Sequence, residues 1–272
     1  MVSPFWLLWA ACGGGCTGGD ADECSRGCAD CFCPGFWIDG TAVSLPDQEP
    51  VDDASLCVSL VDPTPVVDET GGLDYLDRDV PVSTDGSFTF ELVATSSIIG
   101  LVVITHPCPD ASGWAPLGTG ISSDLVASLD YGDELTGVTA YALTTSERDA
   151  WQEDLDLAQV DADLESDGFL AGVVLDGTDP DQASPVGGAT VVAEDHDVDV
   201  FYGDDDLSDG RFTTGTDLNG STDAATLLGF LIPGAPIGTY TASDGQHEYA
   251  SILAGTTEGV SMFLRVPRME GR

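Results

Sequence analysis

The densest group of side chains that could bind a ligand is a run of aspartates in the second half of the chain. Seven carboxylates fall within fifteen residues: Asp195, Asp197, Asp199, Asp204, Asp205, Asp206 and Asp209. Hard oxygen ligands at this density suit Ca2+, but the glycine and the closing glutamate of an EF-hand are not at the required positions. The run predicts either a calcium site or a solvated acidic loop with diffuse counterions. Ca2+ is the one candidate cofactor.

The three histidines give little support for catalysis. His196 stands between two aspartates, as an oriented base or a metal ligand would, but no serine or cysteine motif supplies a nucleophile for it. His247 and Glu248 begin like a zinc-protease helix, yet Ser251 occupies the position of the second histidine. His106, beside a proline and a cysteine, is expected in a loop. The sequence also lacks a nucleophile elbow, a phosphate loop and a dinucleotide fingerprint. We therefore predict that the protein is not an enzyme.

Charge is the strongest compositional feature. The 272 residues include 48 Asp and Glu, against seven Arg and no Lys, which gives a formal net charge of -41. Such a chain repels nucleic acid and other polyanions, so nucleic acid is excluded as a partner. Self-repulsion of this size weakens a compact state unless salt or divalent cations screen it. Apolar residues make up 42% of the chain, which is enough for folded cores.

The amino terminus indicates export. The apolar stretch 5–11 ends in two alanines before Cys12, and three glycines then precede Cys16. This segment resembles a bacterial lipoprotein signal peptide. It departs from that pattern because residues 1–4 carry no Lys or Arg, and because Trp9 stands where an aliphatic residue is usual. The resemblance implies lipid on Cys12, with Cys16 as the alternative. The other interpretation is a truncated ordinary signal peptide.

The remaining cysteines fit an oxidising compartment, where thiols form disulfides. Cys57 and Cys108 each lie in or beside a strand-like run, and we predict that they pair. Four more cysteines crowd into ten residues: Cys24, Cys28, Cys31 and Cys33. They would pair among themselves in one of three ways, or else form a metal site.

An internal repeat organises the body of the chain. Residues 49–58 align without gaps on residues 184–193, and each stretch follows a run of alternating residues that begins with Gly40 or Gly172. An Asp-Gly turn before Phe88 has a counterpart before Phe212. Such self-similarity predicts a duplicated module.

Runs with a period of two predict seven short strands in each copy. In the first copy they are 36–45, 56–61, 80–83, 88–93, 99–105, 125–129 and 138–143; in the second they are 169–175, 189–193, 198–202, 227–232, 239–243, 249–253 and 260–266. The stretch between the copies is helical, with Thr144 and Glu147, or Ser146 and Asp149, as a capping box. The fold class is all-β, with two tandem Ig-like β-sandwich domains and one short linking helix.

A family resemblance follows from three strings in the second copy: Gly172 to Asp176, Pro185 to Val191 and Pro236 to Thr241. Their order and spacing look like the carboxypeptidase regulatory-like, or transthyretin-like, β-sandwich family. The resemblance covers residues 168–266 directly and, through the repeat, residues 36–143 more weakly. The insert 195–210 and the segment 214–225 depart from it. It implies a non-catalytic accessory fold on an exported bacterial protein.

The predicted organisation has five parts: a lipoprotein signal peptide 1–12, a Gly- and Cys-rich tether 13–33, sandwich domains at 34–143 and 168–268, and a helical linker 144–167. We predict an exported lipoprotein on the periplasmic or cell-surface side of a bacterial membrane, with a structural or binding role and calcium as a candidate stabiliser. Its expected partners are the membrane through the lipid, divalent cations, envelope proteins or polysaccharide.

Two other functions stay open. The first is a carbohydrate or polymer binder that uses Trp114 and Tyr202, and the second is a hydrolase with its site at the acidic insert 195–210.

Overall fold

The computed structural model describes residues 35–45, 48–93, 99–129, 132–177, 183–202, 229–257 and 259–269. The predicted signal peptide and tether lie outside these ranges. So do both lipidation candidates, Cys12 and Cys16, and the four clustered cysteines at positions 24, 28, 31 and 33. In the described part, no helix is long and apolar enough to span a membrane.

The chain is all-β, as predicted, and its first unit precedes the long helix α4. The strands of this unit are β1 (Phe36–Ser44), β2 (Leu56–Asp62), β3 (Asp74–Pro81), β4 (Ser87–Val93), β5 (Leu101–Pro107), β6 (Trp114–Ala115), β7 (Leu117–Ile121) and β8 (Glu134–Thr144). Two short helices, α2 (Thr64–Val67) and α3 (Ser123–Ala127), lie between strands. Strands β4, β1 and β8 form one layer, and β3, β2, β5 and β7 form the other.

The second unit follows α4 (Thr145–Leu157). Its strands are β9 (Phe169–Asp176), β10 (Ser184–Pro185), β11 (Thr190–Ala193), β12 (Phe201–Tyr202), β13 (Phe230–Pro233), β14 (Gly238–Ser243), β15 (Ile252–Ala254) and β16 (Ser261–Pro267). Strands β13, β9 and β16 form one layer, and β11, β14 and β15 form the other.

The two units repeat the same strand pairing, so the duplication seen in the sequence is structural. Strand β1 pairs antiparallel with β4 and parallel with β8, and β9 pairs in the same way with β13 and β16. The order β2-β5-β7 corresponds to β11-β14-β15. Even the bridge between Val43 and Pro50 has its counterpart, in the pairing of Leu175 with Pro185.

A glycine facing a phenylalanine marks the centre of each repeat. Gly40 lies opposite Phe88 in the register of β1 and β4, and Gly172 lies opposite Phe230 in that of β9 and β13. A Cβ atom on Gly40 would come within 2.3 Å of the Phe88 ring, and one on Gly172 within 2.5 Å of the Phe230 ring. Only glycine leaves room for the ring at either site. In the second unit, Phe230 therefore lies opposite Gly172 as Phe88 lies opposite Gly40 in the first. The sequence motif had paired Phe88 with Phe212, which lies outside the described residues.

Each unit buries its own core between its two layers. The first core includes Ile38, Val58, Phe90, Val103 and Ala140, and the second includes Leu170, Val191, Phe230, Tyr240 and Leu264. Thr105 ties the layers of the first unit together: its buried hydroxyl donates to the carbonyl oxygen of Tyr141 at 2.7 Å. A buried hydrogen bond of this kind links β5 of one layer to β8 of the other.

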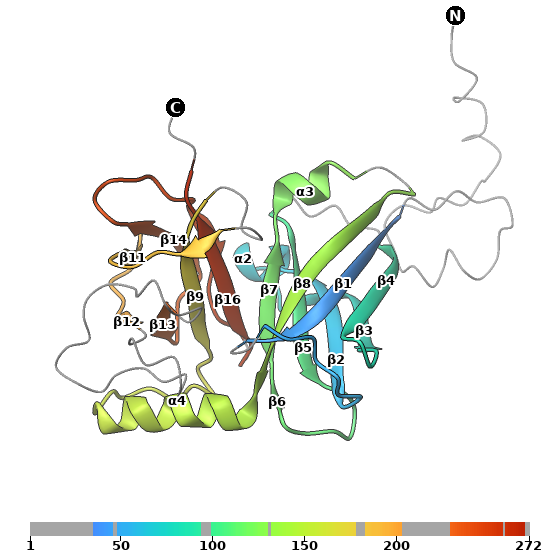
Figure 1. The fold of residues 1–272 in the computed structure, drawn as a ribbon, viewed down its shortest axis with the longest axis horizontal. Coiled ribbons are helices and arrows are strands. Elements are labelled where there is room, and N and C mark those ends of the chain that lie inside the picture. The colour runs from blue at the N-terminus through green and yellow to red at the C-terminus, as the bar shows by residue number, and fades with distance from the viewer. Residues whose placement is uncertain are drawn as a thin grey trace, which may run out of the picture.

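The two units share one sheet, which the sequence did not indicate. Strand β16 pairs in parallel with β9 on one side and with β7 of the first unit on the other. This contact fuses one layer of each unit into a nine-stranded sheet that runs from β12 to β3. In Figure 1, β9, β16 and β7 follow one another across the middle of the molecule. The ring centroids of Tyr141, on β8, and Phe263, on β16, lie 4.4 Å apart at this junction.

Helix α4 runs along the bottom of Figure 1, below the strands of the second unit. It begins as the first of the two predicted capping boxes requires: the Thr144 hydroxyl accepts the Glu147 N–H, and the Glu147 carboxylate accepts the Thr144 N–H. Its apolar face buries Trp151 and Leu155, and the Trp151 ring meets the Phe169 ring edge-on. The helix therefore packs against the shared sheet.

The first unit differs from the predicted strands: the strand expected at 80–83 is β3, which begins at Asp74, and two further segments also differ. The predicted strand at 125–129 is helix α3, because Ser122 caps it by accepting the Leu125 N–H. Strand β7 was not predicted, because alternating glycines interrupt its apolar pattern. Gly118 leaves room for Met262, since its Cβ would lie 2.4 Å from the Met262 sulfur.

Candidate functional site

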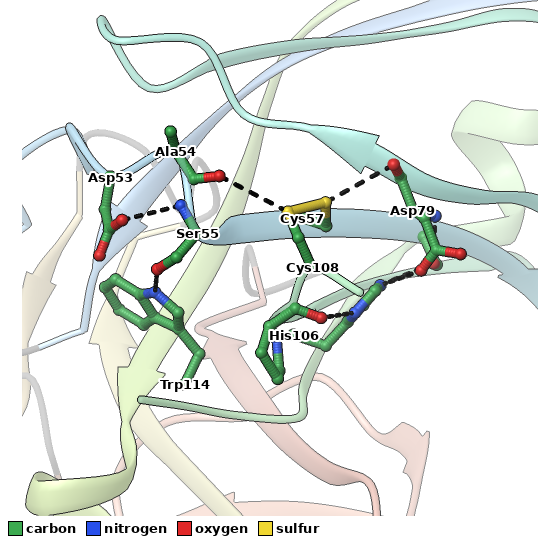
Figure 2. Close-up of a disulfide and its surroundings, with 10 residues drawn as sticks. Asp53, Ala54, Ser55, Cys57, Asp79, His106, Cys108 and Trp114 are labelled. Carbon is green, nitrogen blue, oxygen red and sulfur yellow. Dashed lines mark hydrogen bonds and ion pairs between the residues drawn. A yellow bond between two sulfur atoms is a disulfide. The ribbon is translucent and has the colours of Figure 1, made fainter. Parts of the chain in front are cut away.

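A disulfide joins Cys57 on β2 to Cys108, which directly follows β5 (Figure 2). Its Cα atoms lie 4.8 Å apart, and the two residues are 51 positions apart in sequence. The antiparallel register of the strands brings them together, because Cys57 lies opposite His106. The predicted pairing is confirmed. The bond closes the end of the sheet near the edge strand β3.

A strained residue covers this disulfide. Asp79 has a left-handed backbone with a φ of 55°, at a β-bulge where the register of β2 and β3 shifts. Its carbonyl oxygen lies 3.5 Å from the sulfur of Cys57, which carries no hydrogen because it is bonded to Cys108. Its N–H donates to the Ser59 hydroxyl oxygen at 3.1 Å. A non-glycine residue in this conformation costs about 1 to 3 kcal/mol, so the surrounding bonds must hold it in place.

Ser59 and His106 continue this chain of hydrogen bonds. The Ser59 Oγ and His106 Nε2 atoms are 2.8 Å apart, and His106 Nδ1 is 2.8 Å from the carbonyl oxygen of Pro107. A carbonyl only accepts, so Nδ1 carries the hydrogen of the neutral ring, and Nε2 accepts from Ser59. His106 was expected in a loop but lies in β5, where the pairing with β2 fixes it.

A serine hydrogen-bonded to a histidine could in principle act as a nucleophile with a general base. Here the Ser59 hydroxyl lies between the Asp79 N–H and the His106 ring, and the residue is only 1% exposed. Its oxygen already accepts a hydrogen bond from Asp79 and donates one to His106. The cluster therefore supports the bulge of β3 rather than presenting a nucleophile to a substrate.

The turn before β2 supports the other side of the disulfide. Asp53 accepts the Ser55 N–H at 2.8 Å, and this bond lowers the pKa of the Asp53 carboxyl. The Trp114 ring N–H donates to the Ser55 hydroxyl oxygen at 3.1 Å. The carbonyl oxygen of Ala54 lies 3.8 Å from the sulfur of Cys108 (Figure 2). Trp114 is thus fixed against the turn and the first core.

The second unit lacks this site although its strands are equivalent. The repeat aligns Cys57 with Val192, and Val192 lies opposite Thr241 as Cys57 lies opposite His106. The same strand pairing therefore forms without a disulfide or a histidine. The fold does not require the cluster, which is a specialisation of the first unit.

A second polar cluster lies in the segment between β14 and β15. The Asp244 carboxylate accepts the N–H groups of Gln246 and His247, the His247 ring at 2.6 Å and the Tyr249 hydroxyl at 3.1 Å. The His247 ring, first of all, lowers the pKa of Asp244. Burial, and then the nearby Asp244, raise the pKa of Tyr249 to about 12. As the sequence indicated, His247 is not part of a zinc-protease helix.

The described part of the acidic insert is exposed. Asp195, Asp197 and Asp199 all face solvent, and the His196 ring packs over Gly238 with Nε2 3.2 Å from the carbonyl oxygen of Ile237. The other four predicted calcium ligands, Asp204, Asp205, Asp206 and Asp209, lie outside the described residues. Within the described ranges, no group of three or more His, Cys, Asp or Glu side chains is arranged to hold a metal.

Tyr202 is not a surface aromatic. It is 5% exposed, and its hydroxyl oxygen accepts the N–H of Val191. Trp114 is half-buried and bonded to Ser55. The stacking surface that the carbohydrate-binding alternative assigned to this pair is not present.

Comparisons with known proteins add no assignment. No family model and no curated protein matches the chain. Among solved structures, the shaft pilin SpaA from Lactobacillus rhamnosus GG is 11% identical, with 88% of this chain and 99% of that chain covered and a TM-score of 0.26. A streptococcal ancillary pilin is 14% identical, with coverage of 87% and 63% and a TM-score of 0.23. BcpA, the major pilin subunit of Bacillus cereus, is 7% identical, with coverage of 86% and 99% and a TM-score of 0.24. Similarity at this level carries no argument about function.

Removing the disulfide should destabilise the first unit strongly. With 51 positions between the cysteines, loop entropy predicts that the C57A/C108A variant loses about 4 kcal/mol of unfolding free energy. Urea unfolding of the oxidised protein and the variant measures this loss. The reduced wild-type protein is the control for cavity effects. A loss below about 1 kcal/mol would contradict a structural role for the bond.

Asp244 should make stability depend on pH. Its pKa is lowered in the folded state, so its stabilisation is complete above the pKa of an unfolded aspartate, about 3.9, and is lost as the pH falls further. We expect Asp244→Asn to have a lower melting temperature than wild type at pH 7, and we expect this difference in melting temperature to become smaller below about pH 4. Thermal unfolding of both proteins across this range measures the difference. Asp52→Asn, at an exposed aspartate, should show no comparable difference from wild type. An equal difference in this control would refute the stabilising role of Asp244.

Proposed function

We propose that this chain is an exported, non-catalytic module of the bacterial cell envelope, with a structural or binding role. The Cys57–Cys108 disulfide carries the proposal, because such bonds persist in oxidising compartments and are rare in the cytosol. The duplicated sandwich supports it, since the two units form one continuous scaffold. We also propose that the sandwich units are related to the carboxypeptidase regulatory-like family, whose non-catalytic accessory fold agrees with this role.

The hydrolase alternative gains nothing from the arrangement around His196. The ring is exposed and rests on the backbone of Ile237 and Gly238, and the described aspartates beside it face solvent. A general base needs a nucleophile or a water held within hydrogen-bond reach. The Ser59 and His106 pair has that geometry, but the Ser59 hydroxyl is buried and already bonded to Asp79 and His106. We therefore favour the non-catalytic role.

Attachment to the membrane is the finer part of the proposal. The sequence 5–16 supports lipid on Cys12, or on Cys16 as the alternative. The glycine-rich stretch that follows would then act as a flexible tether to the folded units. The partners we propose are the membrane through this lipid, envelope proteins, polysaccharide and divalent cations.

An intact mass of the protein from the membrane fraction of a bacterial host tests this assignment. We expect a chain that begins at Cys12, carries a diacylglycerol group and has Cys57 and Cys108 oxidised. The C12S variant is the matched control, and it should leave the membrane fraction unless Cys16 is the lipidated residue. An unprocessed chain with reduced cysteines in the soluble cytosolic fraction would contradict export.

Calcium stabilisation is tested separately by thermal unfolding. The full chain is titrated with CaCl2 and with NaCl at matched ionic strength, because a ligand that binds only the folded state raises the melting temperature in a saturable way. We expect CaCl2 to raise the melting temperature more than the matched NaCl control does. This extra increase should be lost in the D204N/D205N/D206N variant. Equal shifts would mean that the acidity acts only as a screened surface.

A further inference from the structure

The edge strand β3 is attached to the sheet through an unusual contact. It is the outermost strand of the nine-stranded sheet, next to β2. The bulge at Arg78 and Asp79 interrupts its pairing with β2, so the N–H of Asp79 bonds to the side chain of Ser59 instead of a backbone carbonyl. Edge strands and bulges belong to the parts of a protein that open at the lowest free energy. The bonds to Asp79 therefore help to keep β3 closed at the bulge, beside the pairing on either side of it.

His106 reaches this bulge across β2. Its Nε2 atom lies 3.9 Å from the Asp79 carboxylate and 2.8 Å from the Ser59 hydroxyl oxygen. The groups that face the imidazole are Ser59 from β2, Asp79 from β3 and the Pro107 carbonyl from its own strand. Asp79 is the one charged side chain that the described residues place within ion-pair distance of it. The imidazole is 18% exposed, so protons from solvent can reach it.

A neutral and a protonated His106 hold the bulge differently. The neutral ring has its hydrogen on Nδ1, committed to Pro107, and it offers the Asp79 carboxylate no donor. A proton taken from solvent onto Nε2 makes this atom a donor and gives the ring a positive charge next to the Asp79 carboxylate. Ser59 can still accept the Asp79 N–H, because a hydroxyl oxygen has two lone pairs. Protonation thus adds an ion pair and removes no bond to β3.

We propose that His106 is a pH sensor that fastens the edge strand β3 to the sheet when its imidazole is protonated. Histidine is the side chain that ordinarily changes charge between about pH 5 and 8. With a proton on Nε2, the His106–Asp79 ion pair clamps the bulge; with a neutral ring, β3 is held at Asp79 by Ser59 alone. Opening of β3 also moves the Asp79 carbonyl away from Cys57, which is otherwise 1% exposed.

The second unit shows that this device is not a by-product of the fold. Thr241 occupies the position equivalent to His106, and Glu194 the one equivalent to Ser59, in a sheet with the same strand pairing. Neither residue forms a histidine–carboxylate contact with a neighbouring strand. The clamp is confined to the first unit, on the strand that ends the shared sheet.

Native-state hydrogen exchange of the full chain tests the clamp. We expect the protection of the Asp79 and Val80 amides, corrected for intrinsic exchange, to rise about two- to fivefold from pH 8 to pH 5.5. The amide of Leu264 in β16 reports global changes and serves as the internal reference. His106→Gln should abolish the relative rise, whereas His196→Gln, at an exposed histidine of the second unit, should leave it unchanged.

Asp79→Asn separates the ion pair from the fold of the bulge. Asparagine tolerates the left-handed backbone and keeps the N–H that bonds to Ser59, but it removes the charge. We expect this variant to fold and to lose the pH-dependent rise. The proposal is overturned if the rise persists in Asp79→Asn, if it persists in His106→Gln, or if the wild-type protein shows no rise beyond that of Leu264.

Discussion

The parallel pairing of β16 with β7 is the contact on which the rest of the structure depends. Strand β16 lies at the edge of one layer of the second unit, and β7 lies at the edge of one layer of the first. An unpaired edge leaves backbone N–H and C=O groups that must find partners when they are buried. The pairing satisfies both edges at once and makes one sheet from two. The Tyr141–Phe263 contact and helix α4 then bury the apolar surface around the junction.

The duplication explains why the two units fit together and also where they differ. Equivalent strands keep the same partners, and Gly40 and Gly172 each accommodate a phenylalanine ring across the same register. One difference lies on the outer strands of the two units. There the first unit has Cys57 and His106, and the second has Val192 and Thr241. The first unit thus has a covalent bond and a histidine–carboxylate contact at its edge strand, and the second has the same strand pairing without them.

Sequence reasoning recovered the features that depend on local pattern. The alternating runs predicted β1, β2, β4 and β9, and the Thr144 capping box predicted the start of α4. The predictions failed for features that depend on contacts between residues distant in the sequence. Strand β7 has too few apolar residues to be recognised, because Gly118 makes room for Met262 from the second unit. The disulfide was predictable from two cysteines in strand-like runs. The Ser59–His106–Asp79 cluster was not predictable, because its residues come from three different strands and one of them lies at a β-bulge. No spacing in the sequence indicates that they meet.

Native-state hydrogen exchange in increasing urea tests most directly whether the two sandwich units form one cooperative body. Amides in β2 and in β14 lie in different units and in different sheets. They exchange through the same unfolding event only if the β7–β16 junction couples the two units. The account predicts that the slowest amides of both strands report the same unfolding free energy and the same dependence on urea. Two distinct free energies, with one unit opening while the other stays protected, would contradict it.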